Sequence, residues 1–370
     1  MKVCLISVEI FAWGKYGGFG KATRTIGREL VKRGIDVFAV VPRRAGQKPV
    51  ETLDGFTVLG FPPHIPFSAM TLFKECDADI YHSCEPSFGT YLAMIAMPHK
   101  KHLVTCRDPR DFEDWKMEFE LPSLNKLQVI HNYIYENNFL VRRSVRRMDG
   151  VYTTAKYLVP KVRSIYGLDE DPLFLPTPVI IPEKVNKSEK PTVCYVARLD
   201  RRKRPELFFD LARKFPEAQF IAIGKSRDGK WDSYLREKYS NTPNLEMTGF
   251  VDQFSSDLHS RILGKSWIMI NTATREGLAN SFLEASAHRC AILSFVDPDG
   301  FATNFGHRVQ DDDFVKGLRY LFEENRWAKQ GQKGYKYVNE HFELNRSIDQ
   351  HLNHYQEILE KKSPGKYPIG

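Results

Sequence analysis

The sequence predicts an α/β protein made of two successive doubly wound domains, each with a parallel sheet between helices. Three observations support this. The length of 370 residues suits two domains, short β-branched apolar runs alternate with amphipathic stretches, and a stretch with five prolines at 172–191 interrupts the alternation. The composition, 42% hydrophobic and 27% charged, is that of a globular protein, so we expect each half to bury a core of its own.

The first half of the chain alternates between strands and helices. Residues 2–8 form a short apolar run, residues 21–33 carry apolar side chains at helical spacing before Gly34, and residues 36–42 form the next apolar run. A strand, a helix and a strand in this order imply parallel strands with a crossover. Further strands are expected at 79–83, 102–106 and 150–155, and one long helical stretch at 123–148.

The alternation restarts after the proline-rich stretch. Residues 192–197 predict a strand, residues 205–215 a helix with Pro205 at its first position, and residues 219–224 a strand. Further strands are expected at 244–251, 267–273 and 291–295, and helices near 229–239, 254–263, 281–289, 312–324, 327–340 and 344–361. Ligands of doubly wound sheets bind at the carboxyl ends of the strands, so we expect the site in a cleft between the domains.

The net charge of +8 and the pI near 9.0 raise the question of an anionic partner. The charge is spread over both halves and forms no basic tail, and no aromatic platform accompanies it. A nucleic-acid binder is therefore the least favoured alternative. Two local clusters of basic residues stand out, at 198–204 and at 142–147.

The six cysteines show no C-x-x-C and no zinc spacing, so we expect reduced core thiols in a cytoplasmic protein. The apolar run at the start is too short for a signal peptide, and no stretch approaches the length that spans a bilayer. Three acidic pairs are interpreted as turns or helix caps, and we expect no metal site. These pairs are Asp77–Asp79, Asp297–Asp299 and Asp311–Asp313.

Three segments could carry chemistry. The glycine cluster at 14–23 matches neither a P-loop nor a dinucleotide fingerprint, but its amides at a helix start suit an anion, and a plain loop is an equal alternative. At the end of a strand, Arg198 and Lys203 suit a diphosphate, with a solvated basic turn as the alternative.

The third segment, 274–285, runs from a strand through a glycine loop into a helix that should begin near Asn280 or Ser281. Ser281 and Glu284 have the spacing of a capping box, and the free amides of the same helix start would also suit an anion. Glu276 and Glu284 are not expected to act as a glycosidase pair, because the helix between them separates their carboxylates too far.

The pattern R-x4-K after a strand, followed by E-G-L-x-N-S-x-x-E-A, resembles the retaining nucleotide-sugar glycosyltransferases of family 4. This resemblance covers nearly the whole chain. It implies the GT-B fold, in which two Rossmann-like domains face a cleft and a C-terminal helix returns to the first domain. The expected division is an acceptor domain at 1–183, a nucleotide-sugar domain at 184–343, and the C-terminal helix and tail at 344–370.

The resemblance also implies roles for individual residues. Arg198 and Lys203 would hold the donor diphosphate and, with Glu276, act in catalysis, while Glu284 would bind the ribose hydroxyls. Other donor contacts would come from residues in four loops. These are Gly17 and Gly18 in the first loop, Gly224, Lys225, Gly249, Phe250 and Val251 around the base, and Gly277, Leu278, Ala279, Asn280 and Ser281 around the sugar and phosphates.

The implied reaction needs no metal and no cofactor. The substrate would be a nucleotide sugar, such as a UDP- or GDP-sugar, and the acceptor a glycan, a lipid or a small molecule. Fixed cations and a helix start would stabilise the departing diphosphate, which could itself accept the proton of the acceptor on the same face. A relative with other sugar-nucleotide chemistry, such as an epimerase, is the alternative.

The chain departs from the family at two places. Arg107 and Asp108 stand where the family often has a histidine, and Thr177–Pro178 replaces its usual Asn-Gly. Candidates for the acceptor side are His82, Arg107, Asp108 and Asp111.

The arginines of the second basic cluster alternate with Leu140, Val141, Val145 and Met148. This pattern allows peripheral contact with an anionic membrane, and an ordinary helix with a solvated basic face is the alternative.

Overall fold

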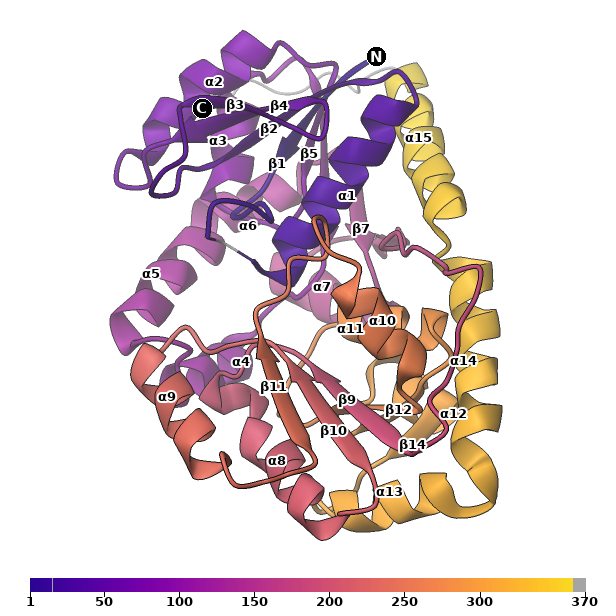
Figure 1. The fold of residues 1–370 in the computed structure, drawn as a ribbon. Coiled ribbons are helices and arrows are strands. Elements are labelled where there is room, and N and C mark those ends of the chain that lie inside the picture. Colours follow the sequence, from indigo (N-terminus) through magenta and orange to yellow (C-terminus); the bar gives the residue numbers. More distant parts are fainter. Residues whose placement is uncertain (15, 362–370) are drawn as a thin grey trace. The chain divides into compact units, whose positions relative to one another are not determined.

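The computed structural model describes residues 1–14 and 16–361, so Lys15 in the glycine cluster and the tail 362–370 lie outside the described residues. The chain forms two compact α/β units (Figure 1). The first unit comprises Met1–Pro109, Asn132–Pro178 and the residues from Asn345 onward, and the second comprises Arg110–His131 and Val179–Leu344. Residues 110–131, which belong to the first half of the sequence, are thus part of the second unit.

The first unit is built on an eight-stranded sheet with the order β3-β4-β2-β1-β5-β6-β7-β8, in which only β3 is antiparallel to its neighbour. Its strands are β1 Lys2–Ile6, β2 Asp36–Pro42, β3 Val50–Leu53, β4 Phe56–Phe61, β5 Ile80–Ser83, β6 Lys101–Cys106, β7 Gly150–Thr153 and β8 Leu173–Phe174. Its helices are α1 Gly18–Lys32, α2 Ala69–Cys76, α3 Phe88–Ala96, α6 Phe139–Val145, α7 Val159–Tyr166 and α15 Leu344–Glu360.

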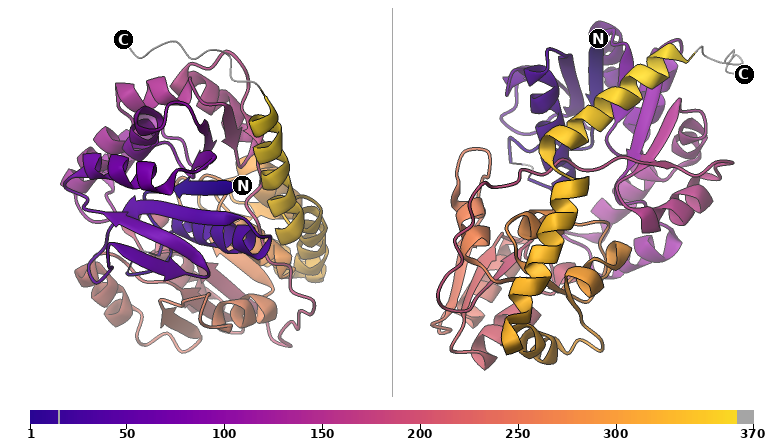
Figure 2. Two further views of the ribbon diagram at one scale, coloured as in Figure 1. Left: turned by 90° about the horizontal axis from the view of Figure 1, so that it is seen from above. Right: turned by 90° about the vertical axis from the view of Figure 1, so that its right-hand side faces the viewer.

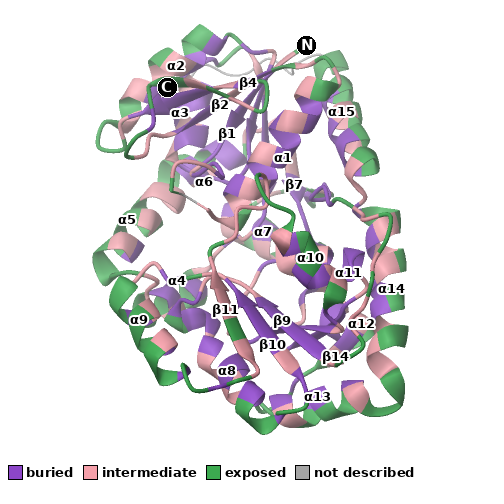
Figure 3. Ribbon diagram, in the orientation of Figure 1, coloured by how far each residue is buried: buried purple, intermediate pink, exposed green. Residues whose placement is uncertain are grey.

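Both faces of this sheet are covered, as expected for parallel strands. Alternate residues of β1 enter different cores, because successive side chains of a strand point to opposite faces. Val3 and Leu5 pack with side chains of α1 and α15, whereas Cys4 and Ile6 pack with those of α2 and α3. Figure 3 shows the strands as the most buried part of the unit. All six cysteines are free and buried.

The helix expected over 123–148 is divided in two, α5 (Lys126–Glu136) and α6. The break falls at two consecutive asparagines. The Asn138 side chain accepts a hydrogen bond from the Val141 amide at 3.0 Å, so Asn138 acts as the N-cap of a new helix. The single helix predicted from apolar periodicity is therefore wrong at this point. α5 crosses the division between the two units.

The C-terminal helix α15 completes the core of the first unit (Figure 2). Tyr355 on α15 is fully buried, and its hydroxyl lies 2.7 Å from Nδ1 of His82 on β5. His351, one turn before Tyr355, is also fully buried and donates from Nδ1 to the Ser347 carbonyl. A segment about three hundred residues from β1 in the sequence therefore supplies part of its core, as the resemblance implied for this helix.

The second unit contains a parallel six-stranded sheet with the order β11-β10-β9-β12-β13-β14. Its strands are β9 Thr192–Val196, β10 Gln219–Ile223, β11 Leu245–Gly249, β12 Ile268–Asn271, β13 Ala291–Ser294 and β14 Gly306–Arg308. Its helices are α4 Phe112–Glu120, α8 Pro205–Lys214, α9 Gly229–Lys238, α10 Leu258–Lys265, α11 Asn280–Ala287, α12 Phe301–Phe305, α13 Phe314–Phe322 and α14 Arg326–His341.

Strand order reverses between β9 and β12 in the second sheet. The chain runs outward through β10 and β11 on one side and through β12, β13 and β14 on the other. The loops after β9 and β12 therefore leave the sheet in opposite directions, which opens a crevice at their carboxyl ends. The strands of both units that the sequence predicts are present, and the expected fold of two parallel-sheet α/β domains is confirmed.

Because His351 is fully buried, we predict that the stability of the protein depends on pH. Burial lowers its pKa from the ordinary 6.5 to about 3. Because the unfolded chain binds a proton that the native state excludes, stability is complete above pH 6.5 and falls as the pH drops toward 3, by about 1.4 kcal/mol per pH unit. We would measure the free energy of unfolding in urea between about pH 7 and about pH 5. In His351→Leu, which keeps the volume, we expect the pH dependence of this free energy to decrease by the contribution of about one proton. An unchanged slope would contradict the assignment.

Candidate active site

Two charged side chains meet at the reversal point of the second sheet. Lys203 lies in the short 3-10 turn Arg201–Lys203 after β9, and Glu276 lies in the loop after β12. The Lys203 ammonium forms an ion pair with Oε1 of Glu276, and the Asn271 amide donates to the same oxygen at 3.2 Å. The structure thus brings together two of the three residues expected to act in catalysis.

Hydrogen bonds from side chains to backbone carbonyls hold the turn that carries Lys203. The Thr272 hydroxyl contacts the carbonyls of Lys203 and Arg204 at 2.6 and 2.9 Å, and the Tyr195 hydroxyl donates to the Lys203 carbonyl at 3.2 Å. Arg204 returns a bond from Nε to the Thr272 carbonyl at 2.7 Å. The loops after β9 and β12 are therefore tied together independently of the ion pair, which fixes where the ammonium points.

Burial determines the electrostatics of this pair. Lys203 is 9% exposed, and burial lowers the pKa of its ammonium, while the Glu276 carboxylate acts in the opposite direction. A charge in such a poorly solvated place interacts strongly with any neighbouring charge. An anion that binds here would therefore be attracted more strongly than by an exposed lysine.

Arg198 is anchored by a buried carboxylate. Its Nη1 lies 3.3 Å from Oδ2 of Asp200, which is 1% exposed. The other oxygen of Asp200 accepts from the Arg227 amide and the Ser226 hydroxyl at 3.3 and 3.4 Å. Asp200 therefore joins the loops after β9 and β10 and sets the position of Arg198.

Gly224 follows β10, where no side chain fits. A Cβ atom there would lie 2.0 Å from the Ala197 carbonyl oxygen, and its φ of +139° is a conformation that side chains avoid. The Gly224 amide donates to the Gly249 carbonyl at 2.8 Å. Gly224 and Gly249 therefore let the loops after β9, β10 and β11 lie close together. The other residues expected around the base lie on these loops, with Lys225 and Phe250 exposed and Val251 half-buried.

The start of α11 differs from the sequence prediction. The helix begins at Asn280, with Ala279 at the N-cap and no side-chain cap. Ser281 is therefore the second helical residue, where its hydroxyl cannot cap, and the predicted capping box with Glu284 is wrong. Gly277 and Leu278, in the loop before this start, are buried. The amides at a helix start carry partial positive charge, which suits an anion.

Glu284, the expected ribose ligand, lies one turn into α11 and pairs with His259. The distance from its Oε2 to Nε2 of His259 is 3.3 Å. His288, one turn further, bonds through Nδ1 to the Glu284 carbonyl at 2.7 Å and through Nε2 to the Ser260 hydroxyl at 2.7 Å. Burial lowers the pKa of His288 to about 4, so His288 is neutral at physiological pH.

A network of buried charges that the sequence did not reveal adjoins the site. Arg275, next to Glu276, pairs through Nε with Asp114 of α4 at 2.6 Å. Glu118 of α4 lies 3.9 Å from Arg275 and 3.8 Å from Arg202, the neighbour of Lys203. α4 therefore contacts both loops that carry the candidate pair. The only local sequence signal is the D-x-x-D spacing of Asp111 and Asp114, which form a capping box.

The glycine loop of the first unit holds an anion of its own chain. Gly17 is the N-cap of α1, and Oε1 of Glu9 accepts from the Gly20 amide at 3.2 Å. A Cβ atom on Gly17 would lie 1.8 Å from that oxygen, so the Glu9 carboxylate could keep this position only with glycine there. The anion position predicted for the loop of Gly17 and Gly18 is therefore occupied by the Glu9 carboxylate in this structure.

Three of the acceptor-side candidates, His82, Arg107 and Asp108, belong to the first unit, and Asp111 belongs to the second. His82 is fully buried between Tyr355 and the Thr105 hydroxyl, and burial holds its pKa well below 6.5. Arg107 is buried and donates through its amide to Glu85 and through Nη1 to Thr177, both at 2.8 Å. Asp108 is half-buried in the loop after Arg107, whereas Asp111 caps α4 in the second unit.

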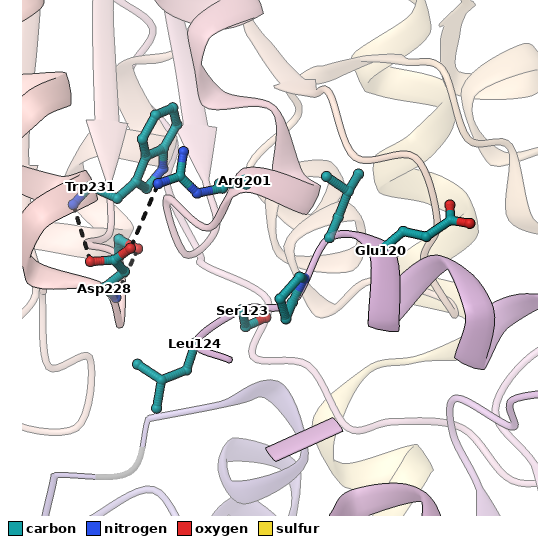
Figure 4. Close-up of a pocket in the computed structure, with 9 residues that line it drawn as sticks. Glu120, Ser123, Leu124, Arg201, Asp228 and Trp231 are labelled. Carbon is teal, nitrogen blue, oxygen red and sulfur yellow. Dashed lines mark hydrogen bonds and ion pairs between the residues drawn. The ribbon is translucent and has the colours of Figure 1, made fainter. Parts of the chain in front are cut away.

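A cavity of about 370 Å³ lies in the second unit (Figure 4). Its walls are the residues after α4 and the start of α9, with the Arg201 guanidinium 4.0 Å from the Trp231 ring centre. Arg201 and the amide of Trp231 both contact Asp228, at 3.7 and 3.2 Å. Neither Lys203 nor Glu276 lines this cavity. Among residues 1–14 and 16–361, no group of three His, Cys, Asp or Glu could hold a metal.

The α4 network makes a prediction about stability. Arg275→Met keeps an apolar stem but removes the buried cation that pairs with Asp114 at 2.6 Å, so we expect a loss of about 3 kcal/mol in denaturant unfolding. The matched control is Arg213→Met, which breaks an exposed pair with Asp210 and should cost less than about 1 kcal/mol. If both changes lowered the free energy of unfolding equally, the buried network would stabilise the protein no more than an exposed ion pair does.

Two family models match adjacent parts of the chain. The model described as Glycosyltransferase Family 4 matches residues 16–179, and the model described as Glycosyl transferases group 1 matches residues 178–346. No curated protein matches the chain.

Solved structures of similar fold cover almost the entire chain. Sucrose-phosphate synthase from Thermosynechococcus elongatus is 14% identical with a TM-score of 0.72, over 96% of this chain and 98% of that one. Anabaena HepE in complex with UDP-glucose is 12% identical with a TM-score of 0.73, over 96% and 100%. The catalytic domain of starch synthase IV from Arabidopsis thaliana, bound to ADP and acarbose, is 12% identical with a TM-score of 0.65, over 97% and 99%.

The fold, the charged pair at the reversal point of the second sheet and the two adjacent family models agree with one another. The chain is a glycosyltransferase of the GT-B type.

Proposed function

We propose that this glycosyltransferase moves a sugar from a nucleoside diphosphate donor to a hydroxyl of a glycan, lipid or small-molecule acceptor, with retention of configuration. The observation that carries the proposal is the placement of Lys203 and Arg198 after β9, beside a helix start without a side-chain cap. The UDP-glucose complex of the structurally similar HepE supports a nucleotide sugar as donor.

The chemistry follows from where charge develops. The bond between the sugar C1 and the phosphate oxygen breaks, and the diphosphate gains negative charge as it leaves. Lys203 and Arg198 are positioned cations, and the amides at the start of α11 add partial positive charge, so together they stabilise this charge with little rearrangement. The acceptor oxygen then bonds to C1 from the same face, and its proton passes to the departing phosphate oxygen.

Glu276 has two roles in this proposal. Before the donor binds, it neutralises Lys203 and avoids an unpaired buried cation. When the diphosphate approaches Lys203, the carboxylate can turn toward the hydroxyls of the transferred sugar, while Asn271 still donates to it. Glu284 on α11 would receive the ribose hydroxyls, beside His259.

The first test is nucleotide binding, which needs no acceptor. We expect UDP, GDP or ADP, or one of their sugar conjugates, to raise the Tm of the protein. Arg198→Met and Lys203→Met, which keep the side-chain stems, should lose this rise and lower turnover by about 10²-fold or more. The matched control Lys214→Met, an exposed lysine at the far end of α8, should behave like the wild type. Full nucleotide response in Arg198→Met and Lys203→Met would refute the proposed diphosphate site.

The second test concerns metal and stereochemistry. Because side chains and helix amides carry the charge of the leaving group, we expect excess EDTA to change the rate by less than about twofold. NMR of the product should show the anomeric configuration of the donor sugar. A large loss that Mg²⁺ restores, or an inverted product, would contradict this mechanism. A donor sugar epimerised in the absence of any acceptor would instead favour epimerase-like chemistry.

A further inference from the structure

Exposed apolar side chains gather on one segment of the chain. Among the described residues, ten of the twenty-two exposed large hydrophobic side chains lie between Phe112 and Leu140. Scattered exposed apolar residues are normal, but a concentration of them marks a surface that meets another apolar phase. The segment includes the helix α5, which carries the clearest pattern.

Several apolar residues of α5 are exposed. Leu127, Ile130 and Ile134 are 77%, 44% and 60% exposed, and their spacing of i, i+3 and i+7 places them on one face of the helix. The only buried residue of α5 is Val129. Figure 3 shows the helix almost entirely in the colours of exposed and intermediate residues. We call Leu127, Ile130 and Ile134 the α5 strip. An amphipathic helix normally turns its apolar face toward the core of the protein, but the α5 strip is exposed.

The chain around the α5 strip is basic. Residues 121–148 contain five Lys or Arg residues and a single acidic residue, Glu136. Lys126 begins the helix, and Arg143 and Arg146 are exposed on and just after α6. Val141 and Val145, which the sequence placed among these arginines as apolar contacts, are fully buried, whereas Phe139 is 70% exposed. The exposed apolar surface near these arginines in the sequence is therefore the α5 strip and not the valine face of α6.

We propose that the α5 strip docks this protein on the surface of an anionic lipid bilayer. The apolar strip would enter the boundary between headgroups and acyl chains, and Lys126 with the arginines of α6 would attract lipid phosphates. No helix among residues 1–14 and 16–361 is long and apolar enough to cross a membrane. Docking of this kind is parallel to the surface and reversible.

The charge of the segment decides among possible occupants. A second copy packed symmetrically on α5 would bring the same basic segment against itself, and like charges in contact disfavour that arrangement. A nucleic acid would be attracted by the arginines but would gain nothing from Leu127, Ile130 and Ile134, because bases stack on aromatic rings and not on aliphatic side chains. An anionic bilayer satisfies both the aliphatic strip and the positive charge.

Vesicle sedimentation of the full chain tests this proposal. We expect the wild type to pellet with equimolar phosphatidylcholine and phosphatidylglycerol vesicles at low salt, less with phosphatidylcholine alone, and less at high salt. The triple variant Leu127→Ser, Ile130→Ser, Ile134→Ser should partition at least about tenfold more weakly. Lys126→Gln and Arg143→Gln should each weaken binding about fivefold.

The matched control removes three equally exposed apolar side chains elsewhere. Val50, Ile65 and Leu173 are 58%, 51% and 55% exposed, and their triple serine variant should pellet like the wild type. The Tm and its rise with nucleotide are measured for every variant. Neither should change in the α5 triple variant, since its residues lie outside the candidate active site, so failure of membrane docking and failure of the proposed sugar transfer are distinguishable.

Three outcomes would overturn the proposal. The wild type could fail to pellet with phosphatidylglycerol vesicles, or bind phosphatidylcholine equally well, which would remove the anionic lipid. The α5 triple variant could bind vesicles as tightly as the wild type, which would place the contact elsewhere. Analytical ultracentrifugation could show a dimer that the triple variant abolishes without vesicle binding by the wild type, which would assign the strip to a second copy.

Discussion

The rest of the second unit depends on one constraint, which is that the buried charge of Lys203 needs a partner. Glu276 supplies it from a loop that follows a different strand, so both loops must be held in register. The hydroxyls of Thr272 and Tyr195 hold the backbone of the turn. The start of α11, where Ala279 at the N-cap makes no side-chain cap, lies in the chain directly after the loop that carries Glu276. A site of this kind is prepared for an anion before the anion arrives, which is the condition for electrostatic catalysis.

α4 extends this constraint to a distant part of the sequence. Asp114 and Glu118 pair with Arg275 and Arg202, each of which is the immediate neighbour of one member of the central pair. α4, the turn after β9 and the loop after β12 therefore together determine the position of the pair of Lys203 and Glu276. This explains why contacts place residues 110–131 in the second unit although they precede the linker by some fifty residues. A change in α4 would reach the Lys203 ammonium through the backbone of the adjacent residues.

Periodicity and local geometry made much of the fold predictable. Apolar runs located the strands, Pro205 marked the first residue of α8, and the order of strands and helices implied a parallel sheet. The capping box predicted at Ser281 is absent, because the helix begins one residue earlier, at Asn280, and the sequence alone did not reveal this. Glu9 in the glycine loop and the α4 network were also invisible, since each is a pairing between residues far apart in sequence that no local pattern encodes.

The structure also changes the meaning of the positive charge. The basic cluster at 198–204 is the densest in the sequence, yet each of its five cations has an acidic partner within 4 Å. The pairs are Arg198–Asp200, Arg201–Asp228, Arg202–Glu118, Lys203–Glu276 and Arg204–Asp312. In the proposed reaction, a donor diphosphate would therefore compete with carboxylates for Arg198 and Lys203, which would favour release of the product nucleotide once the sugar has left. Residues 121–148 are different, because five cations there face a single glutamate in the sequence. Part of the surplus charge thus lies in the same stretch of sequence as the exposed strip of α5, where it suits the anionic surface that we propose as the partner of this strip.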